Sequence, residues 1–409
     1  MIKHPGTFFL GRKILLPFVA AAMAAFTGLV SANPIGGQVT AGQIRISDVA
    51  GLTTITQTDM RGIVNWQDFS IGAGEITQFI QPNASAVTLN RVVGGVPSSL
   101  NGTLSANGRV YLINPSGILV GPTGRINTAA FVASTLDVPD GEFLAGENMR
   151  FTGASLEGVV NLGIITAAEG DVILMGRSVE NAGTINAPNG VAALAAGSDI
   201  LMRAAGDERV VINAGNAGGG KGVTNSGAIN AAQAELKAAG GNVYELAVNN
   251  TGMVRATGLR KTKGGRVILS ASGGGGAVVN RGQVIAKNSD GGGGKIKLGG
   301  GQGGSSTNEG NLNASADDSG KPGGTVEMLG DRVTVGNGST IDVSGSDGGL
   351  VAIGISEELA AQATPAGGLA ALAQSPGAKA AVQTTFESDS RILANSTISG
   401  NGGNIIVWS

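Results

Sequence analysis

The chain has 409 residues, a formal net charge of −2, 71 glycines and no cysteine, and only 3% of its residues are aromatic. The mildly acidic balance argues against a nucleic-acid-binding protein, and the lack of cysteine excludes a disulfide scaffold. A hydrophobic fraction of 42% argues against disorder. Many glycines with few aromatics and many short aliphatic runs are typical of a β-solenoid, in which tight turns surround a thin aliphatic core.

Residues 1–32 have the pattern of a secretory signal peptide. Lys3, Arg12 and Lys13 supply a basic start, and an uncharged apolar run follows over 14–30. This run is shorter than a typical membrane span and ends in small residues, so we expect cleavage after Ala32 rather than an uncleaved anchor. No later segment is apolar for long enough to span a bilayer as a helix. The sequence therefore predicts an exported protein.

Residues 33–140 are expected to form an N-terminal β cap together with the first coils of the solenoid. Alternating strand patterns occur at 42–46 and 52–57. A solenoid needs an atypical terminal unit, because an uncapped coil exposes strand edges and its apolar core to water.

Within this region, the segment 109–121 reads as a strand, a tight turn and a second strand. Asn114 can accept a backbone hydrogen bond at the first turn position, and Pro115 presets φ at the second. Gly117 is favoured at the fourth position, so a type I turn is predicted. Taken alone, the segment fits a purely structural turn equally well.

Residues 141–352 contain a repeated phrase that predicts a parallel β-helix. Asn, any residue and Gly, followed by apolar or small residues, recur at 161–165, 181–185, 225–229, 250–254, 280–284 and 308–312. A second phrase, a glycine followed by alternating aliphatics, recurs at 170–174, 265–269, 294–298 and 324–328. Spacings of 20 to 30 residues indicate solenoid coils, and we interpret the one interval of 44 residues as two coils. We expect the asparagines to form an amide ladder along one edge, and the glycines to occupy positive-φ corners.

Two further segments follow the repeats. Residues 353–390 are predicted to be an excursion from the β-helix, with one or two short helices or as a flexible linker, because 356–378 is rich in Ala, Glu, Gln and Leu. Residues 391–409 resume the strand pattern and are predicted to be a further coil of a longer, truncated solenoid.

Several segments resemble the N-terminal secretion domain of two-partner secretion exoproteins of the filamentous-haemagglutinin type. They lie at 63–71, which contains Asn65-Trp66, and at 78–81, 89–92, which contains Asn90-Arg91, 109–121 and 127–137. Asn114 to Ile118 matches the family's Asn-Pro-Asn-Gly-Ile turn motif, except that Ser116 replaces the third residue. A second family motif, Asn-Pro-Asn-Leu, is absent, which makes the chain more similar to the high-molecular-weight adhesin branch.

This resemblance implies a right-handed parallel β-helix and recognition by an outer-membrane β-barrel transporter of the TpsB type, through its periplasmic POTRA domains. A partly folded chain can add strands to the POTRA sheets by β-augmentation, and coils that stack outside the cell would bias transport outward. We expect a monomer that is secreted or held at the bacterial cell surface after periplasmic transit. The candidate recognition residues are Asn65, Trp66, Asn90, Arg91, Asn114, Pro115, Ser116, Gly117 and Ile118.

An enzyme is the alternative from a different class, because parallel β-helices also carry polysaccharide-acting enzymes. The only histidine, His4, lies in the signal segment, and there is no cysteine. The mature chain therefore lacks the residues for a Ser-His-Asp, Cys-His or ordinary zinc site. We expect the carboxylate pairs at 317–318 and 357–358 to be solvated charges, and we predict a protein that is not an enzyme and needs no cofactor or metal.

The cargo remains open between two interpretations. The β-helix is expected to serve as an adhesin or haemagglutinin rod, because an adhesin needs length and surface rather than a pocket. The alternative is the same secretion domain delivering a C-terminal toxin, cytolysin or haem-scavenging cargo.

Overall fold

The computed structural model describes residues 33–204, 206, 208–213, 222–240, 246–258, 264–318, 320–357 and 381–409. The predicted signal peptide at 1–32 lies outside these ranges, as does most of the predicted excursion. Residues 32–409 belong to one compact unit. In the described ranges the regular structure is almost entirely β-strand, with one short helix, α1 (Asp140–Ala145). None of the described segments is a helix long and apolar enough to cross a bilayer.

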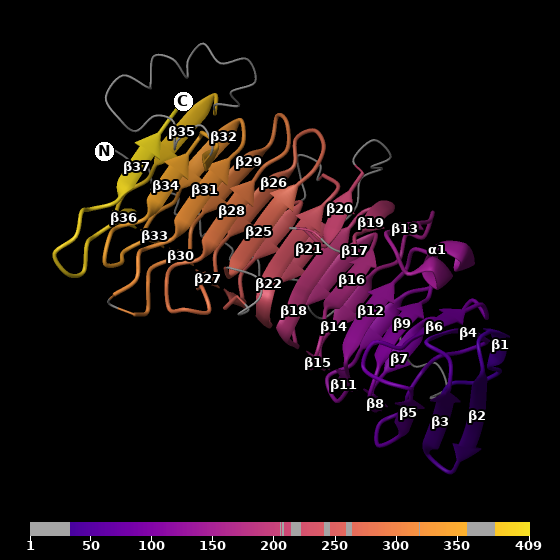
Figure 1. The fold of residues 1–409 in the computed structure, drawn as a ribbon. Helices are drawn as coiled ribbons and strands as arrows, with labels where there is room; N and C mark the ends of the chain where they lie inside the picture. The colour runs from indigo at the N-terminus through magenta and orange to yellow at the C-terminus, as the bar shows by residue number, and fades with distance from the viewer. Residues whose placement is uncertain are drawn as a thin grey trace, which may run out of the picture. The chain divides into compact units, whose positions relative to one another are not determined.

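The strands form three stacks, each running from coil to coil (Figure 1). Stack A contains β3 (Leu52–Gln57), β5 (Ile76–Ile80), β8 (Thr103–Ala106), β11 (Arg125–Thr128), β15 (Ile164–Ala167), the first parts of β18 (Thr184–Ala196) and β22 (Ala228–Ala238), β24 (Met253–Ala256), β27 (Gln283–Ala286), β30 (Asn311–Asn313), β33 (Thr340–Asp342) and β36 (Arg391–Leu393). Stack B contains β4 (Arg61–Trp66), β6 (Val87–Val92), β9 (Arg109–Ile113), β12 (Ala130–Ser134), β16 (Val172–Gly176), the last parts of β18 and β22, β25 (Arg266–Ala271), β28 (Lys295–Gly299), β31 (Thr325–Leu329), β34 (Leu350–Ile353) and β37 (Asn404–Val407). Stack C contains β7 (Ser98–Leu100), β10 (Ile118–Val120), β14 (Val159–Asn161), β17 (Ser178–Asn181), β21 (Gly222–Asn225), β23 (Val248–Asn250), β26 (Ala277–Asn280), β29 (Ser305–Asn308), β32 (Arg332–Val335) and β35 (Gln383–Phe386).

Neighbouring coils pair in parallel, which confirms the predicted parallel β-helix. The exceptions in these stacks lie at the N-terminal end, where β1 (Gln38–Ala41) pairs antiparallel with β4 and β2 (Ile44–Val49) pairs antiparallel with β3. These two strands cover the first coil, as a cap must, because the edge of a parallel stack otherwise presents unpaired N–H and C=O groups.

Each coil contributes aliphatic side chains in register to one continuous core. In stack A, the inward positions of successive strands are occupied by residues that are all fully buried: Leu104, Ile126, Ile165, Ile185, Ile229, Val254, Val284, Leu312 and Ile341. A turn of the chain cannot bury its apolar face alone, so the core exists only because the coils stack.

The repeated asparagines form a continuous ladder inside the β-helix. Each side-chain amide donates to the carbonyl oxygen of the next, at 2.7 to 2.8 Å, along the series Asn161, Asn181, Asn225, Asn250, Asn280 and Asn308. All six are fully buried. The predicted amide ladder is thus confirmed, but it lies in the interior rather than on an edge, where an unpaired amide would be costly.

Glycines such as Gly258 and Gly330 do occupy positive-φ corners between strands, but the glycines of the Asn-X-Gly phrase do not, so for them the prediction is wrong. Gly163, Gly183, Gly227, Gly252, Gly282 and Gly310 have no positive φ, and each lies against the coil before it. A Cβ on Gly252, for example, would lie 2.2 Å from the carbonyl oxygen of Gly227. That oxygen accepts the backbone hydrogen bond from Met253 at 2.9 Å. Glycine is required here because one backbone passes directly over another.

The 44-residue interval is one coil, not two. β17 pairs directly with β21, with Asn181 opposite Asn225. The extra length carries two strands that leave the coil, β19 (Asp199–Met202) and β20 (Val210–Ile212). They form a separate antiparallel sheet with β13 (Met149–Thr152), in which β19 is the middle strand. An insertion between coils changes the sequence period without changing the stacking.

The C-terminal segments are described in part. Residues 358–380, the greater part of the predicted excursion, lie outside the described ranges. β35, at 383–386, pairs with β32 and is therefore part of a coil, although the sequence assigned it to the excursion. β36 and β37 continue stacks A and B. The other predicted boundaries between cap, repeats and excursion stay predictions.

Substitution of a ladder glycine tests the stacking constraint. Gly252→Ala should destabilise the β-helix by about 1–3 kcal/mol, because its Cβ would overlap the Gly227 carbonyl oxygen. Urea unfolding followed by circular dichroism measures the loss. Gly141→Ala is the matched control, since no atom lies within 4 Å of its Cβ position and the site is in α1. Equal stability of the two variants would contradict the close-approach explanation.

Candidate functional site

The structure brings the predicted recognition residues together at one place. β4, β6 and β9 are consecutive strands of stack B, and the predicted residues lie at or just beyond their C-terminal ends (Figure 1). Asn65 is opposite Arg91 and Arg91 is opposite Ile113, the residue before Asn114. These segments are about twenty residues apart in sequence. They lie side by side because they occupy the same position in successive coils.

Trp66 and Asn90 are interior partners. The indole Nε1 of Trp66 donates to Asn90 Oδ1 at 3.0 Å, and Asn90 Nδ2 donates to the Tyr111 carbonyl oxygen at 3.2 Å. Both side chains are at most 1% exposed, and the Trp66 ring packs edge-on against Phe69. A buried indole needs an acceptor for its N–H, and Asn90 supplies it. These two residues shape the first coils and do not present a surface in the folded protein.

Arg91 points to the opposite face of the sheet and holds the segment that leads into α1. Its guanidinium contacts Asp137 at 2.9 Å, Asp140 at 2.8 Å and the Val138 carbonyl oxygen at 3.0 Å. Burial lowers the pKa of Arg91, but the two carboxylates outweigh it and raise the pKa above its ordinary value. The charged Arg91 side chain therefore links β6 to the start of α1 and to the residues just before it.

Arg61, one coil earlier, makes a second link to α1. Arg61 Nη1 donates to the Phe143 carbonyl oxygen at 2.5 Å, and its guanidinium lies 5.4 Å from the centre of the Phe143 ring. Phe143 is fully buried and packs edge-on against Tyr111. Both arginines thus fix α1 to the outer face of stack B.

The outer face of stack B is apolar over its first coils and is covered, a feature the sequence analysis missed. The cover consists of α1, β13, β19 and β20, and it buries a second hydrophobic cluster that includes Ile63, Leu89, Tyr111, Ile113, Val132, Ile173 and Met175. The available signal was the uninterrupted apolar run in β12 and β16, since strands buried on both faces do not alternate. Arg150 and Asp199 join β13 to β19 through an ion pair of 2.5 Å.

The predicted β-turn at 114–117 is present, while its type I geometry stays a prediction. Gly117 N–H donates to the Asn114 carbonyl oxygen at 3.0 Å, and Ser116 N–H donates to Asn114 Oδ1 at 2.9 Å. Gly117 has φ +107°, a conformation that favours glycine. Asn114 also donates from Nδ2 to the Val96 carbonyl oxygen at 2.8 Å and to Ser98 Oγ at 2.9 Å. This one buried amide therefore joins the turn to the coil before it.

The chain segments that contact the turn carry exposed apolar side chains. Pro115 is exposed and Ser116 is half-buried, while Asn114, Gly117 and Ile118 are buried. Val93, Val96 and Leu156, which we call the apolar rim, are 52%, 43% and 78% exposed. Ser155, the residue before Leu156, donates from its hydroxyl to the Pro115 carbonyl oxygen at 2.6 Å, and the Val96 carbonyl oxygen accepts from Asn114 Nδ2. Leu156 and Val96 therefore lie on segments that contact the turn.

Asn65 differs from the other site residues in its hydrogen bonding. Its Oδ1 is buried and accepts no hydrogen bond from the residues that the structure describes. The described ranges also hold no group of three or more His, Cys, Asp or Glu side chains that could bind a metal ion. What the site offers is a shaped backbone turn with an apolar rim.

The parallel β-helix, its antiparallel N-terminal cap and this turn are together the features of a β-helical secretion domain. Residues 31–283 match the family model of the TPS (two-partner secretion) secretion domain, and the chain belongs to this family. Exoproteins of this family leave the cell through an outer-membrane transporter.

The relatives include two curated proteins, each called heme/hemopexin-binding protein, from Haemophilus influenzae. One, from the Rd strain, is 34% identical over 179 residues, which are 41% of this chain and 20% of that protein. The other is 42% identical over 85 residues, which are 21% of this chain and 9% of that protein. The matches thus span a fifth or less of these relatives. The crystal structure of the HMW1 secretion domain from Haemophilus influenzae has the same fold, with a TM-score of 0.67 at 23% identity, over 91% of this chain and 100% of that chain.

The Trp66–Asn90 contact can be tested through stability. Trp66→Phe should cost about 1–3 kcal/mol, because it leaves Asn90 Oδ1 buried without its indole donor. Chemical unfolding followed by circular dichroism gives the difference. Trp408→Phe, at the half-buried end of stack B, is the control and should have a much smaller effect. A neutral Trp66→Phe would mean that the contact adds nothing to the cap.

Proposed function

We propose that the turn at 114–118 and its apolar rim are the surface by which an outer-membrane TpsB-type transporter recognises this exoprotein. The observation that carries the proposal is the convergence of the motif residues at the ends of β4, β6 and β9. Exposed apolar side chains beside a rigid polar turn favour a protein partner, because an apolar patch that no partner covers lowers the solubility of the protein.

The residues divide into two roles in this proposal. Trp66, Asn90 and Asn114 hold the shape from the inside, since all three are buried. Pro115, Ser116 and the apolar rim make the contact, since they are accessible.

The periplasmic POTRA domains are the proposed contact point on the transporter. Before the coils close, β-strands of the chain can add to the POTRA sheets by β-augmentation. Outside the cell, each coil then folds on the one before it and buries its aliphatic column. Nearest-neighbour folding of this kind draws the chain outward without another energy source.

The proposed role of the secreted product is that of a non-enzymatic adhesin or haemagglutinin rod, acting as a monomer in the medium or at the cell surface. A haem-carrier cargo is the second candidate, because both curated relatives are called heme/hemopexin-binding proteins. Agglutination of erythrocytes by the secreted chain, compared with its capture of hemopexin, distinguishes the two.

The role of Asn114 is tested by secretion. Asn114→Ala removes the bonds to Val96, Ser98 and Ser116 and should cost about 1–3 kcal/mol of local stability. We expect transporter-dependent release into the medium to fall sharply, as measured by immunoblots of medium and periplasm with and without the cognate transporter. Asn401→Ala, at an exposed asparagine, should be released normally. If Asn114→Ala is exported normally, the motif is a structural turn without a role in secretion.

A surface variant separates recognition from folding. Leu156→Asp should reduce release while leaving the unfolding midpoint unchanged, because the side chain is 78% exposed. Val49→Asp is the matched control, an exposed apolar residue at 69% on the cap strand β2, and should be released like the wild type. Equal release of both variants would place recognition away from the apolar rim.

A further inference from the structure

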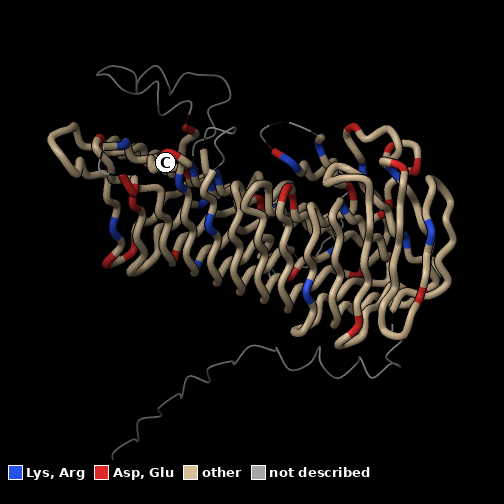
Figure 2. The backbone as a smooth tube through the Cα atoms, turned by 60° about the horizontal axis from the view of Figure 1, so that its bottom comes forward, with Lys and Arg blue, Asp and Glu red and all other residues tan. Residues whose placement is uncertain are grey.

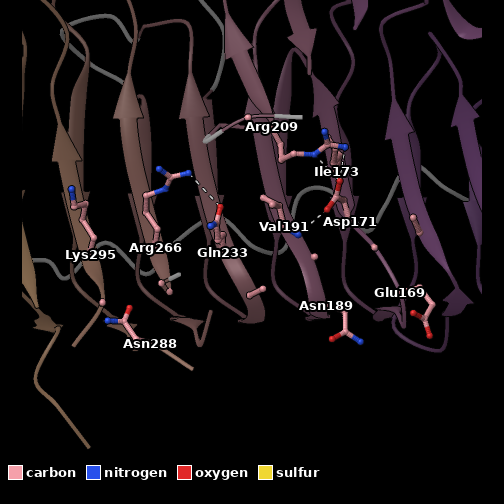
Figure 3. Close-up of a pocket in the computed structure, with 18 of the residues that line it drawn as sticks. Glu169, Asp171, Ile173, Asn189, Val191, Arg209, Gln233, Arg266, Asn288 and Lys295 are labelled. Atoms are coloured by element: carbon pink, nitrogen blue, oxygen red, sulfur yellow. Dashed lines mark hydrogen bonds and ion pairs between the residues drawn. The ribbon is translucent and has the colours of Figure 1, made fainter. Parts of the chain in front are cut away.

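A groove runs along the outer face of stack B and reaches beyond the cover. Its volume is about 830 Å³, and its lining extends from β9 to β31. Figure 3 shows polar side chains of successive strands pointing into it. The groove is separate from the turn at 114–118, none of whose residues line it.

One row of the groove is polar and strictly registered. Gln233 on β22, Arg266 on β25 and Lys295 on β28 are opposite one another, one strand apart, and we call them the polar row (Figure 3). Strands in a sheet lie about 4.8 Å apart, so the row presents a donor at that interval. Arg266 donates to Gln233 at 3.3 Å and has no ion pair with a described residue. Lys295 pairs with Glu357 at 2.5 Å.

The groove floor is kept open by the stacking of the coils. Gly265, Gly294 and Gly324 line it at the corner between stacks A and B. A Cβ on Gly294 would lie 2.4 Å from the Gly265 carbonyl oxygen, and one on Gly324 would lie 1.9 Å from that of Gly294. These positions therefore cannot carry a side chain, and they present backbone to the groove.

The charge of the lining is positive although the chain is net negative. The cations are Arg109, Arg209, Arg266 and Lys295, and the anions are Glu169 and Asp171. Asp171 is already held by Arg209 at 2.7 Å. The amide side chains of Asn189 and Asn288 stand at the floor's edge (Figure 3).

We propose that this groove binds an extended polyuronate, a glycan that carries a carboxylate on each sugar. Carboxylates would pair with Arg266 and, in place of Glu357, with Lys295. The side-chain oxygens of Asn189 and Asn288, whose Nδ2 atoms donate to backbone carbonyl oxygens, would accept hydrogen bonds from hydroxyls. The Gln233 amide would also bind hydroxyls. Sugar rings would lie on the glycine floor, since the spacing between coils is close to the length of one hexopyranose along an extended chain. A nucleic acid fits less well, because the aromatic residue in the described lining, Tyr111, is buried and offers no platform for bases. Acidic and basic residues are also interspersed along the coils (Figure 2).

The test uses the secreted, folded chain and an oligogalacturonate long enough to span the polar row. Isothermal titration at low salt should show binding that falls as salt rises and is absent with the fully methyl-esterified oligomer. The double variant Arg266→Gln/Lys295→Gln should bind roughly tenfold or more weakly, because two charge-assisted contacts are lost. Arg255→Gln, an exposed arginine on β24 in the same coil as Arg266, should bind like the wild type.

Other results overturn the proposal. These are no binding to the oligogalacturonate, unchanged binding by the double variant, equal loss in Arg255→Gln, or equal binding of the methyl ester. Tighter binding of single-stranded DNA of the same charge would assign the groove to a different polyanion. Unfolding midpoints of all variants are compared first, so that a folding defect is not taken for a lost contact. The proposal does not depend on the transporter-recognition role, which is read from release into the medium.

Discussion

Direct stacking of one backbone coil on the next is the constraint on which the rest of this molecule depends. The glycines after each ladder asparagine lie under the carbonyl oxygen of the coil before, with no room for a Cβ. This approach lets each asparagine amide reach its neighbour at 2.7 to 2.8 Å and satisfies polar groups that would be costly in the interior. The same approach aligns the aliphatic columns that form the core.

The stacking also explains how distant sequence segments come together at the candidate recognition site. Because β4, β6 and β9 are in register, their C-terminal ends lie side by side, and the turn at 114–118 joins them through the Asn114 amide. The outer face then varies from coil to coil. It is apolar and covered near the N-terminus, and it becomes polar from β22 onward, where Gln233, Glu235 and Lys237 replace apolar residues.

Local chemistry in the sequence was sufficient for several features. The Asn-X-Gly phrase predicted the coils and their amide ladder, because an asparagine repeated once per coil lies beside the same residue of the neighbouring coil. The Asn114-Pro115-Ser116-Gly117 turn was likewise predicted, since its backbone preferences reside within four residues. Other features depended on long-range packing. The role of the ladder glycines became evident only from the close approach of neighbouring coils. The single 44-residue coil became evident only from the pairing of Asn181 with Asn225.

The sequence by itself determined the parallel β-helix, the asparagine ladder and the turn, because each arises from a repeated or local preference. Only the tertiary structure decided that Trp66 and Asn90 are interior partners, that Arg91 fastens α1, and that the cover and the groove share one face of stack B. The physical reason is that side-chain direction and register between strands set these contacts. Both depend on which coil lies beside which, and an insertion such as 197–213 leaves no periodic trace in the sequence.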